Sequence, residues 1–305
     1  MNFKALQKKI RQLLKEKNAI LLAHNYQRPE IQDVADLTGD SLGLSLEAAK
    51  TEAEIIVFCG VHFMAETASI VCPDKVVLLP VISAGCPLAD MITAPALAQK
   101  KAQYPGVPVV SYVNSPASVK AESDICCTSA NAVQVVNSLV KDDTVLMTPD
   151  KNLAHYAQRH TDKEILCWEG FCTYHDSLAP EQVMMVKRDH PHALLLAHPE
   201  CRPAVINLAD EVKSTSGMLD YVRRSPAKEF IIATETGIIH TLETQNPDKI
   251  FIPADERMVC TDMKKIHLDD IVHALVTQSP VIKVEEDTRV KAYRAVERML
   301  EVPRD

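Results

Sequence analysis

The feature that most constrains the fold of this chain is a pattern that occurs three times along it. Short apolar runs alternate with longer amphipathic stretches, which is typical of parallel strands joined by helices. Corresponding runs recur after about 87 residues, so the pattern predicts three similar units. The predicted strands span residues 19–23, 55–58 and 75–79, then 107–112, 144–147 and 164–167, then 193–197, 230–233 and 249–252.

This repeat predicts an α/β fold of three similar three-layer α/β/α domains, each with a three-stranded parallel sheet. We place the domains at residues 1–85, 86–171 and 172–263. Residues 264–305 are expected to contribute helices that pack back on the first domain. Residues 1–18 are predicted to form an amphipathic helix rather than an export signal, because apolar residues alternate with lysine, arginine and glutamate.

Composition excludes several classes of protein. The 305 residues carry a net charge of −8, which argues against non-specific binding to nucleic acid or to a membrane surface. No apolar run approaches the length of a transmembrane helix, so we expect a cytoplasmic protein. Only 8 glycines are present and neither glycine-rich phosphate-binding motif occurs, which excludes both common phosphate loops. The odd number of cysteines, 9, argues against a disulfide framework.

Three of the cysteines follow the repeat. Cys86, Cys172 and Cys260 lie shortly beyond the third strand of their units, where parallel α/β folds place their chemistry. If the units surround a pseudo-threefold axis, the three thiols meet on it. Structural zinc usually takes four ligands from CxxC pairs, which are absent, whereas a [4Fe–4S] cluster with three thiolates keeps one iron open as a Lewis acid.

The alternative for any cysteine is the role of a small buried apolar side chain. We expect that role for the remaining six, which are Cys59, Cys72, Cys126, Cys127, Cys167 and Cys201.

Polar clusters follow the first strand of each unit. They are His24-Asn25-Tyr26-Gln27, Tyr112-Val113-Asn114-Ser115 and His198-Pro199-Glu200-Cys201. His175 adds a further base three residues after Cys172. Together these groups are sufficient for several proton transfers, although a single histidine at such a place is often only a satisfied polar residue.

Hydroxyl-bearing residues stand at the start of three predicted helices. They are Ser41, Ser129 and Thr215, the last preceded by Ser214. Their simplest role is N-capping. The free N–H groups of a helix start also bind carboxylate or phosphate, so three such starts around one axis suit a small substrate with several anionic groups.

Taken together, these motifs resemble those of the quinolinate synthase family. They run in order from residue 24 to 265: HNYQ, GDSLGL, AGCPLADM, YVNSPASVKAESDICCTSAN, GFCTYH, AHPEC, STSGM and MVCTDMKK. The resemblance implies three α/β/α domains around a pseudo-threefold axis. It also implies condensation of iminoaspartate with dihydroxyacetone phosphate to quinolinate in NAD synthesis, with loss of phosphate and two waters. L-aspartate oxidase is then the candidate upstream supplier of iminoaspartate.

Carried over residue by residue, the resemblance implies one [4Fe–4S] cluster held by Cys86, Cys172 and Cys260, with one open iron as a Lewis acid. The catalytic residues it implies are Glu200 as the main base, Tyr26 and His175 as proton relays, and also Tyr112 and His198. The substrate-binding residues it implies are His24, Ser41, Tyr112, Val113, Asn114, Ser129, His198, Pro199, Glu200, Ser214 and Thr215. One departure is visible: residues 258–263 hold one cysteine where some members have CxxCxxC, so no disulfide switch is available in this loop.

Other classes stay open. One is an aconitase-like hydro-lyase that uses the same open iron on another hydroxy acid; activity with dihydroxyacetone phosphate and iminoaspartate separates the two. Another is a non-enzymatic iron–sulfur sensor or electron carrier, which predicts a fully ligated cluster and no turnover. A structural zinc site is a third, distinguished by its lack of colour. The density of acid–base residues favours an enzyme.

Overall fold

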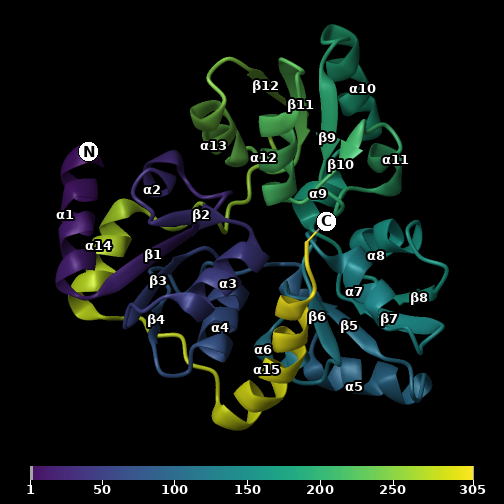
Figure 1. Cartoon of the computed structure of the whole chain (residues 1–305), viewed down its shortest axis with the longest axis horizontal. Helices are drawn as coiled ribbons and strands as arrows, with labels where there is room; N and C mark the ends of the chain where they lie inside the picture. Colours follow the sequence, from purple (N-terminus) through teal and green to yellow (C-terminus); the bar gives the residue numbers. More distant parts are fainter. Residues whose placement is uncertain (1–2, 305) are drawn as a thin grey trace.

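The computed structural model describes residues 3–304, and within that range it contains three four-stranded parallel sheets (Figure 1). Positions 1, 2 and 305, which the predicted first helix and the outer domain limits include, lie outside the described residues. The sheet orders are β2-β1-β3-β4, β6-β5-β7-β8 and β10-β9-β11-β12, so one topology occurs three times. We call these sheets, with the helices that connect their strands, units 1, 2 and 3. The predicted fold class is confirmed.

The strands are β1 (Ala19–His24), β2 (Leu37–Gly39), β3 (Ile55–Cys59), β4 (Val76–Leu78), β5 (Val109–Tyr112), β6 (Ile125–Cys127), β7 (Thr144–Thr148), β8 (Glu164–Cys167), β9 (Leu194–Ala197), β10 (Glu211–Val212), β11 (Glu229–Ala233) and β12 (Ile250–Pro253). The two central strands of each sheet are nearly continuous apolar runs; all five residues of β3 are buried. This composition follows from helices that cover both faces of a parallel sheet.

Each sheet has one strand more than the three that the sequence predicts. The additional edge strands β2, β6 and β10 are only two or three residues long, too short for an apolar period to register. An aspartate precedes each of them and accepts a hydrogen bond from a backbone N–H of the neighbouring strand. These bonds are Leu21 to Asp36 at 2.8 Å, Val109 to Asp124 at 2.8 Å and Leu195 to Asp210 at 2.7 Å.

The helices are α1 (Phe3–Glu16), α2 (Pro29–Gln32), α3 (Ser41–Lys50), α4 (His62–Val71), α5 (Ala94–Gln103), α6 (Ala117–Lys120), α7 (Ala132–Ser138), α8 (Lys151–Gln158), α9 (Thr173–Ser177), α10 (Pro180–Asp189), α11 (Pro203–Ile206), α12 (Thr215–Arg224), α13 (Ile238–Gln245), α14 (Leu268–Thr277) and α15 (Glu286–Glu301), with a short 3₁₀ turn at Ala89–Met91. The predicted amphipathic helix is present as α1, which buries Ile10 and Leu14. None of the helices within residues 3–304 is both long and apolar enough to cross a membrane.

The last two helices pack in different places. Helix α14 lies against α1 in unit 1, whereas α15 lies between α4 of unit 1 and α6 and β6 of unit 2 (Figure 1). Its buried face, which includes Ala292, Ala295 and Met299, belongs to the main hydrophobic core, to which all three units contribute. The C-terminus therefore lies near the centre of the molecule, between the three units.

Candidate active site

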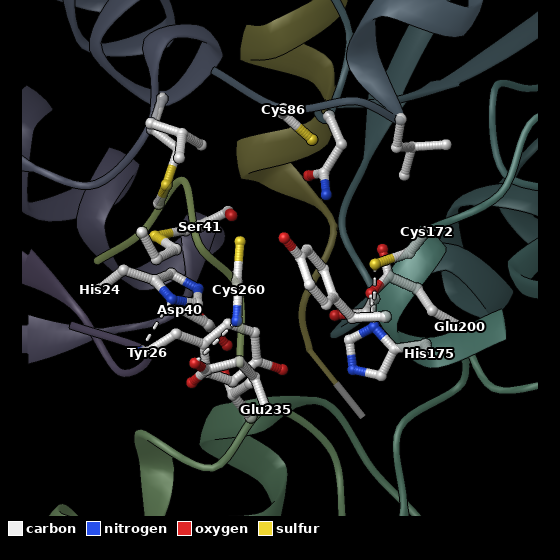
Figure 2. A pocket seen from close by; sticks show the side chains of 18 of the residues that line it. His24, Tyr26, Asp40, Ser41, Cys86, Cys172, His175, Glu200, Glu235 and Cys260 are labelled. Carbon is white, nitrogen blue, oxygen red and sulfur yellow. Dashed lines mark hydrogen bonds and ion pairs between the residues drawn. The ribbon is translucent and has the colours of Figure 1, made fainter. Parts of the chain in front are cut away.

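A pocket with an atom-free volume of about 710 Å³ lies where the carboxyl ends of the three sheets meet (Figure 2). His24 ends β1, Tyr112 ends β5 and His198 directly follows β9, so equivalent strands deliver equivalent polar residues. Thirteen of the predicted site residues line it: His24, Tyr26, Ser41, Cys86, Tyr112, Asn114, Ser129, Cys172, His175, His198, Glu200, Thr215 and Cys260.

The other three predicted residues are not among the lining residues. Val113 is buried, and its backbone N–H bonds to the carbonyl of Cys127. Pro199 is buried between two lining residues. Ser214 accepts a hydrogen bond from the backbone N–H of Gly217 and caps α12. Their side chains contribute to local structure rather than to the pocket wall.

The three repeating thiols meet in this pocket, one from each unit (Figure 2). Burial raises the pKa of Cys86 to about 12 and that of Cys260 to about 11. Burial, followed by the charge of Glu200, raises the pKa of Cys172 well above its ordinary value. Such thiols stay protonated until a metal centre replaces their protons, because an isolated thiolate is costly in a low-dielectric site.

The other six cysteines lie elsewhere. Five of them are buried and Cys167 is half-buried. No disulfide is formed among the described residues, and none of these six lines the central pocket. Their packing agrees with the role of small apolar side chains.

Two carboxylates that the sequence analysis did not predict hold two of the cysteine loops. Asp150 follows β7 and accepts a hydrogen bond from the backbone N–H of Cys172 at 3.1 Å. Glu235 follows β11 and accepts one from the N–H of Cys260 at 3.1 Å, while pairing with Lys264 at 2.9 Å. Burial raises the pKa of both carboxyls. Both carboxylates follow the second strand of a unit, whereas the predicted polar clusters and cysteines follow first and third strands.

Glu200 is the centre of the acid–base cluster. Its Oε2 lies 2.8 Å from Nδ1 of His175 and 3.2 Å from Nδ1 of His198, and the two imidazole rings stack 4.7 Å apart. Burial acts to raise the pKa of Glu200, but the two histidines lower it by more, so the net pKa is below its usual value. Glu200 is therefore a charged carboxylate, and its buried Oε1 has no hydrogen-bond partner.

A chain of hydrogen bonds leads away from this carboxylate. His175 Nε2 lies 2.8 Å from the hydroxyl of Thr234, which lies 2.5 Å from the hydroxyl of Tyr26. One path for a proton thus connects units 1, 2 and 3 through Tyr26, Thr234, His175 and Glu200. Burial raises the pKa of Tyr26 well above its ordinary value, so its phenol keeps its proton.

His24 is neutral and has a defined tautomer. Burial, together with the nearby His198 and Lys264, lowers its pKa to about 3. The backbone N–H of Tyr26 donates to its Nδ1 at 3.1 Å, which places the ring proton on Nε2. His24 therefore presents an N–H donor rather than a cation.

None of the three hydroxyl residues Ser41, Ser129 and Thr215 caps its helix, and the hydroxyl of Thr215 accepts a hydrogen bond from Nδ2 of Asn25 at 3.2 Å. Asp40 caps α3 and Ser214 caps α12, one residue earlier than expected, so Ser41 and Thr215 are the first helical residues. Ser129 precedes α7 and lies 3.2 Å from Nε2 of His198. A capping residue lies directly before the first helical residue, so a residue that is itself in the first turn does not act as the cap.

Further lining residues were not predicted. They are Asp40, Val61, Phe63, Met64, Gly85, Leu88, Thr128, Tyr174, Glu235 and Met263. The apolar ones, Val61, Phe63, Met64, Leu88 and Met263, have no local pattern that distinguishes them from core residues. Asp40 and Tyr174 adjoin predicted residues, so a search of neighbouring positions would have found them. No lysine or arginine is among the described residues that line the pocket.

Fold and site together define an α/β enzyme whose thiol-lined acid–base centre lies where three repeated units meet. The family described as quinolinate synthetase A protein matches residues 8–301. The chain is 57% identical over 305 residues, all of both chains, to the quinolinate synthase of Geobacter metallireducens. It is 56% identical over 295 residues, 97% of each chain, to that of Methanoregula boonei. The chain belongs to the quinolinate synthase family, and the resemblance seen in the sequence is confirmed.

Proposed function

We propose that this protein condenses iminoaspartate with dihydroxyacetone phosphate to form quinolinate, with release of phosphate and two waters. The observation that carries the proposal is the convergence of a charged, partly unpartnered Glu200 and three thiols in one pocket of a family member. The reaction needs a C–C bond, a C=N bond and several proton transfers. The pocket offers both a base and a path for protons.

The donor set fits a [4Fe–4S] cluster held by Cys86, Cys172 and Cys260. Each unit supplies one thiol, and no fourth thiol lines the pocket among residues 3–304. A cluster with three protein ligands leaves one iron open, which would supply a Lewis acid for substrate oxygens. A second donor set is Cys172, His175 and Glu200, whose ligand atoms all lie within 4.8 Å of one another. That set would suit a single ion such as zinc, so metal analysis is part of the test.

The proposed substrate-binding roles follow from donors and acceptors that line the pocket. The hydroxyls of Ser41, Ser129 and Thr215 stand at or near helix starts, where N–H groups favour carboxylate and phosphate oxygens. Asn114 Oδ1 is buried without a partner and would accept from a substrate hydroxyl or N–H. His24 would donate through Nε2 to a substrate oxygen. The aligned reactants would then need little further ordering.

In this proposal Glu200 removes a proton from substrate carbon through its free Oε1. His175 holds the other carboxylate oxygen and passes a proton along Thr234 to Tyr26, which stays protonated and can donate to a leaving hydroxide. Tyr112 and His198 complete the wall around the reacting atoms. Burial raises the pKa of Tyr112 well above its ordinary value, so it too would act as a donor.

We also propose the remaining predictions. These are the domain limits after residues 85, 171 and 263, action in the cytoplasm, and supply of iminoaspartate by L-aspartate oxidase. Free thiols at all nine cysteines support a reducing compartment.

The test is an anaerobic assay of the purified chain with dihydroxyacetone phosphate and freshly generated iminoaspartate. Quinolinate formation, together with about four iron and four sulfide per chain, is the expected result. Absence of quinolinate with an intact cluster would favour a hydro-lyase or an electron carrier. A colourless protein that contains zinc would overturn the cluster assignment.

A further inference from the structure

The proposed substrates are anionic, yet the charged side chains among the described residues that line the central pocket are all acidic. Its acidic lining residues are Asp40, Glu200 and Glu235, and no lysine or arginine is among the described residues that line it. The whole chain carries a net charge of −8. A phosphate ester approaching this pocket therefore needs positive charge close to the mouth.

That charge gathers in a second pocket beside the first. Its lining residues are Lys213, Ser214, Gly217, Asp220, Tyr221, Arg224 and Arg304, around an atom-free volume of about 630 Å³. Three of these side chains are cationic and one is acidic. Ser214 caps α12, and the next residue, Thr215, lines the central pocket. The second pocket thus opens directly beside the first turn of a helix that both pockets share.

The chain end brings Arg304 to this place. Asn131 is fully buried and donates through Nδ2 to the carbonyls of Met299 and Val302, each at 3.2 Å. Its Oδ1 accepts the N–H of Thr128, next to Ser129 of the central pocket. The chain then reaches unit 1, where Arg304 lies 3.5 Å from Oδ2 of Asp40. This arm ends between the three units, as the C-terminus in Figure 1 shows.

The contact between Arg304 and Asp40 joins the two pockets. Asp40 is 4% exposed and lines the central pocket, and its Oδ2 has no hydrogen bond, whereas the side chain of Arg304 is 37% exposed. The other two cations pair weakly: Lys213 with Glu211 at 3.3 Å, and Arg224 with Asp220 at 3.2 Å. Exposed pairs of this kind contribute little, so a doubly charged phosphate can compete for these cations.

We propose that Arg304, together with Lys213 and Arg224, forms an anion-binding vestibule that receives the phosphate group of the phosphorylated substrate at the mouth of the active site. The inference rests on the proposed function, because that function supplies a phosphate ester. Arg304 is the key member, since it alone contacts a residue that lines the central pocket. Its guanidinium can hold two phosphate oxygens at once.

The first test measures binding of inorganic phosphate to the anaerobically purified full-length protein by isothermal titration calorimetry. We expect Arg304→Gln to weaken phosphate binding at least fivefold and Arg304→Lys to recover part of the loss. Arg188→Gln is the matched control, since Arg188 is an exposed cation that lines neither pocket and pairs only with Asp189, at 3.9 Å. It should change the dissociation constant less than twofold. Absence of phosphate binding, or equal effects of Arg304→Gln and Arg188→Gln, would overturn the vestibule.

The second test measures turnover. In Arg304→Gln the KM for dihydroxyacetone phosphate should rise about fivefold or more, while kcat changes less than twofold and the melting temperature stays the same. An unchanged KM would overturn the reception of substrate. If phosphate binding depends on Arg304 but the wild-type protein makes no quinolinate, the vestibule stands and the proposed function fails.

Discussion

Units 2 and 3 hold their pocket cysteines in one way and unit 1 in another. In units 2 and 3 the loop after the second strand supplies a carboxylate, Asp150 or Glu235, that accepts the N–H of the unit's own cysteine. In unit 1 the second strand is followed by Gly60 and Val61, which have no such group. The N–H of Gly85, next to Cys86, bonds instead to Asp262 of the unit 3 cysteine loop at 3.2 Å.

Unit 1 therefore depends on a residue of unit 3 to hold the loop of its pocket cysteine. Lys265 strengthens this link, since its Nζ donates to the carbonyl of Ser83 at 2.6 Å and pairs with Asp262 at 2.6 Å. Unit 1 contributes the apolar lining residues Val61, Phe63 and Met64 together with Asp40, whereas the other two acidic lining residues, Glu200 and Glu235, belong to unit 3.

The variants with the largest expected effect test whether the three units each supply a thiol ligand of the cluster. Cys86→Ala, Cys172→Ala and Cys260→Ala should each reduce iron from about four per chain to a small fraction and abolish quinolinate formation. Iron and sulfide analysis with the visible spectrum measures this. Cys59→Ala is the control, since Cys59 is buried in the core away from the pocket. Retention of the cluster in any of the three variants would remove that unit from the ligand set.

The second prediction concerns the charged side of the pocket. Glu200→Gln keeps the shape but removes the base, so kcat should fall by about 10² to 10⁴ while iron content stays unchanged. Steady-state kinetics alongside metal analysis separates these quantities. Near-normal turnover with a normal cluster would contradict the assignment of Glu200 as the base.

The third prediction addresses the loop carboxylates. Asp150→Ala and Glu235→Ala each leave a buried N–H without its acceptor, which should cost about 1 to 3 kcal/mol of unfolding free energy. The cluster should also be lost several times faster to a chelator. Asp262→Ala should have a smaller effect, because this carboxylate is more exposed than the other two. Chelation followed at the visible band of the cluster gives the rates; equal rates in all three variants would remove the distinction between units.

The smallest expected effect concerns His24, which ends β1 of unit 1. The pKa of His24 is about 3 in the folded protein, and 6.5 is the ordinary value. Between these two pH values the imidazole is protonated in the unfolded chain but neutral in the folded chain. The contribution of the neutral His24 to the free energy of unfolding is therefore full above about pH 6.5 and decreases as the pH falls below it. At pH 5 the loss is about 2 kcal/mol. Urea unfolding at pH 7 and pH 5 should show a smaller decrease in His24→Gln than in the wild type; parallel decreases would contradict a neutral His24.

Several parts of the structure could be predicted because they depend on short segments. The predicted strands of each unit, which are the two central strands and one edge strand of its sheet, follow from apolar runs. The polar residues at their ends follow from the topology of parallel sheets. The edge strands β2, β6 and β10 could not be found in this way, since pairing with a neighbour rather than composition creates them. Their preceding aspartates, such as Asp36, are a repeated signal that a later search could use.

By itself, the sequence determined the threefold α/β repeat, the three cysteines that follow it and the family. These features are local, because each depends on residue spacing within one unit or on a motif of a few residues. Tertiary structure alone decided that Asp150 and Glu235 hold cysteine loops, that Thr234 links Tyr26 to His175, and that Arg304 reaches Asp40. The last two contacts join segments from different units. Their energies depend on burial and distance in the folded chain, which sequence spacing does not encode.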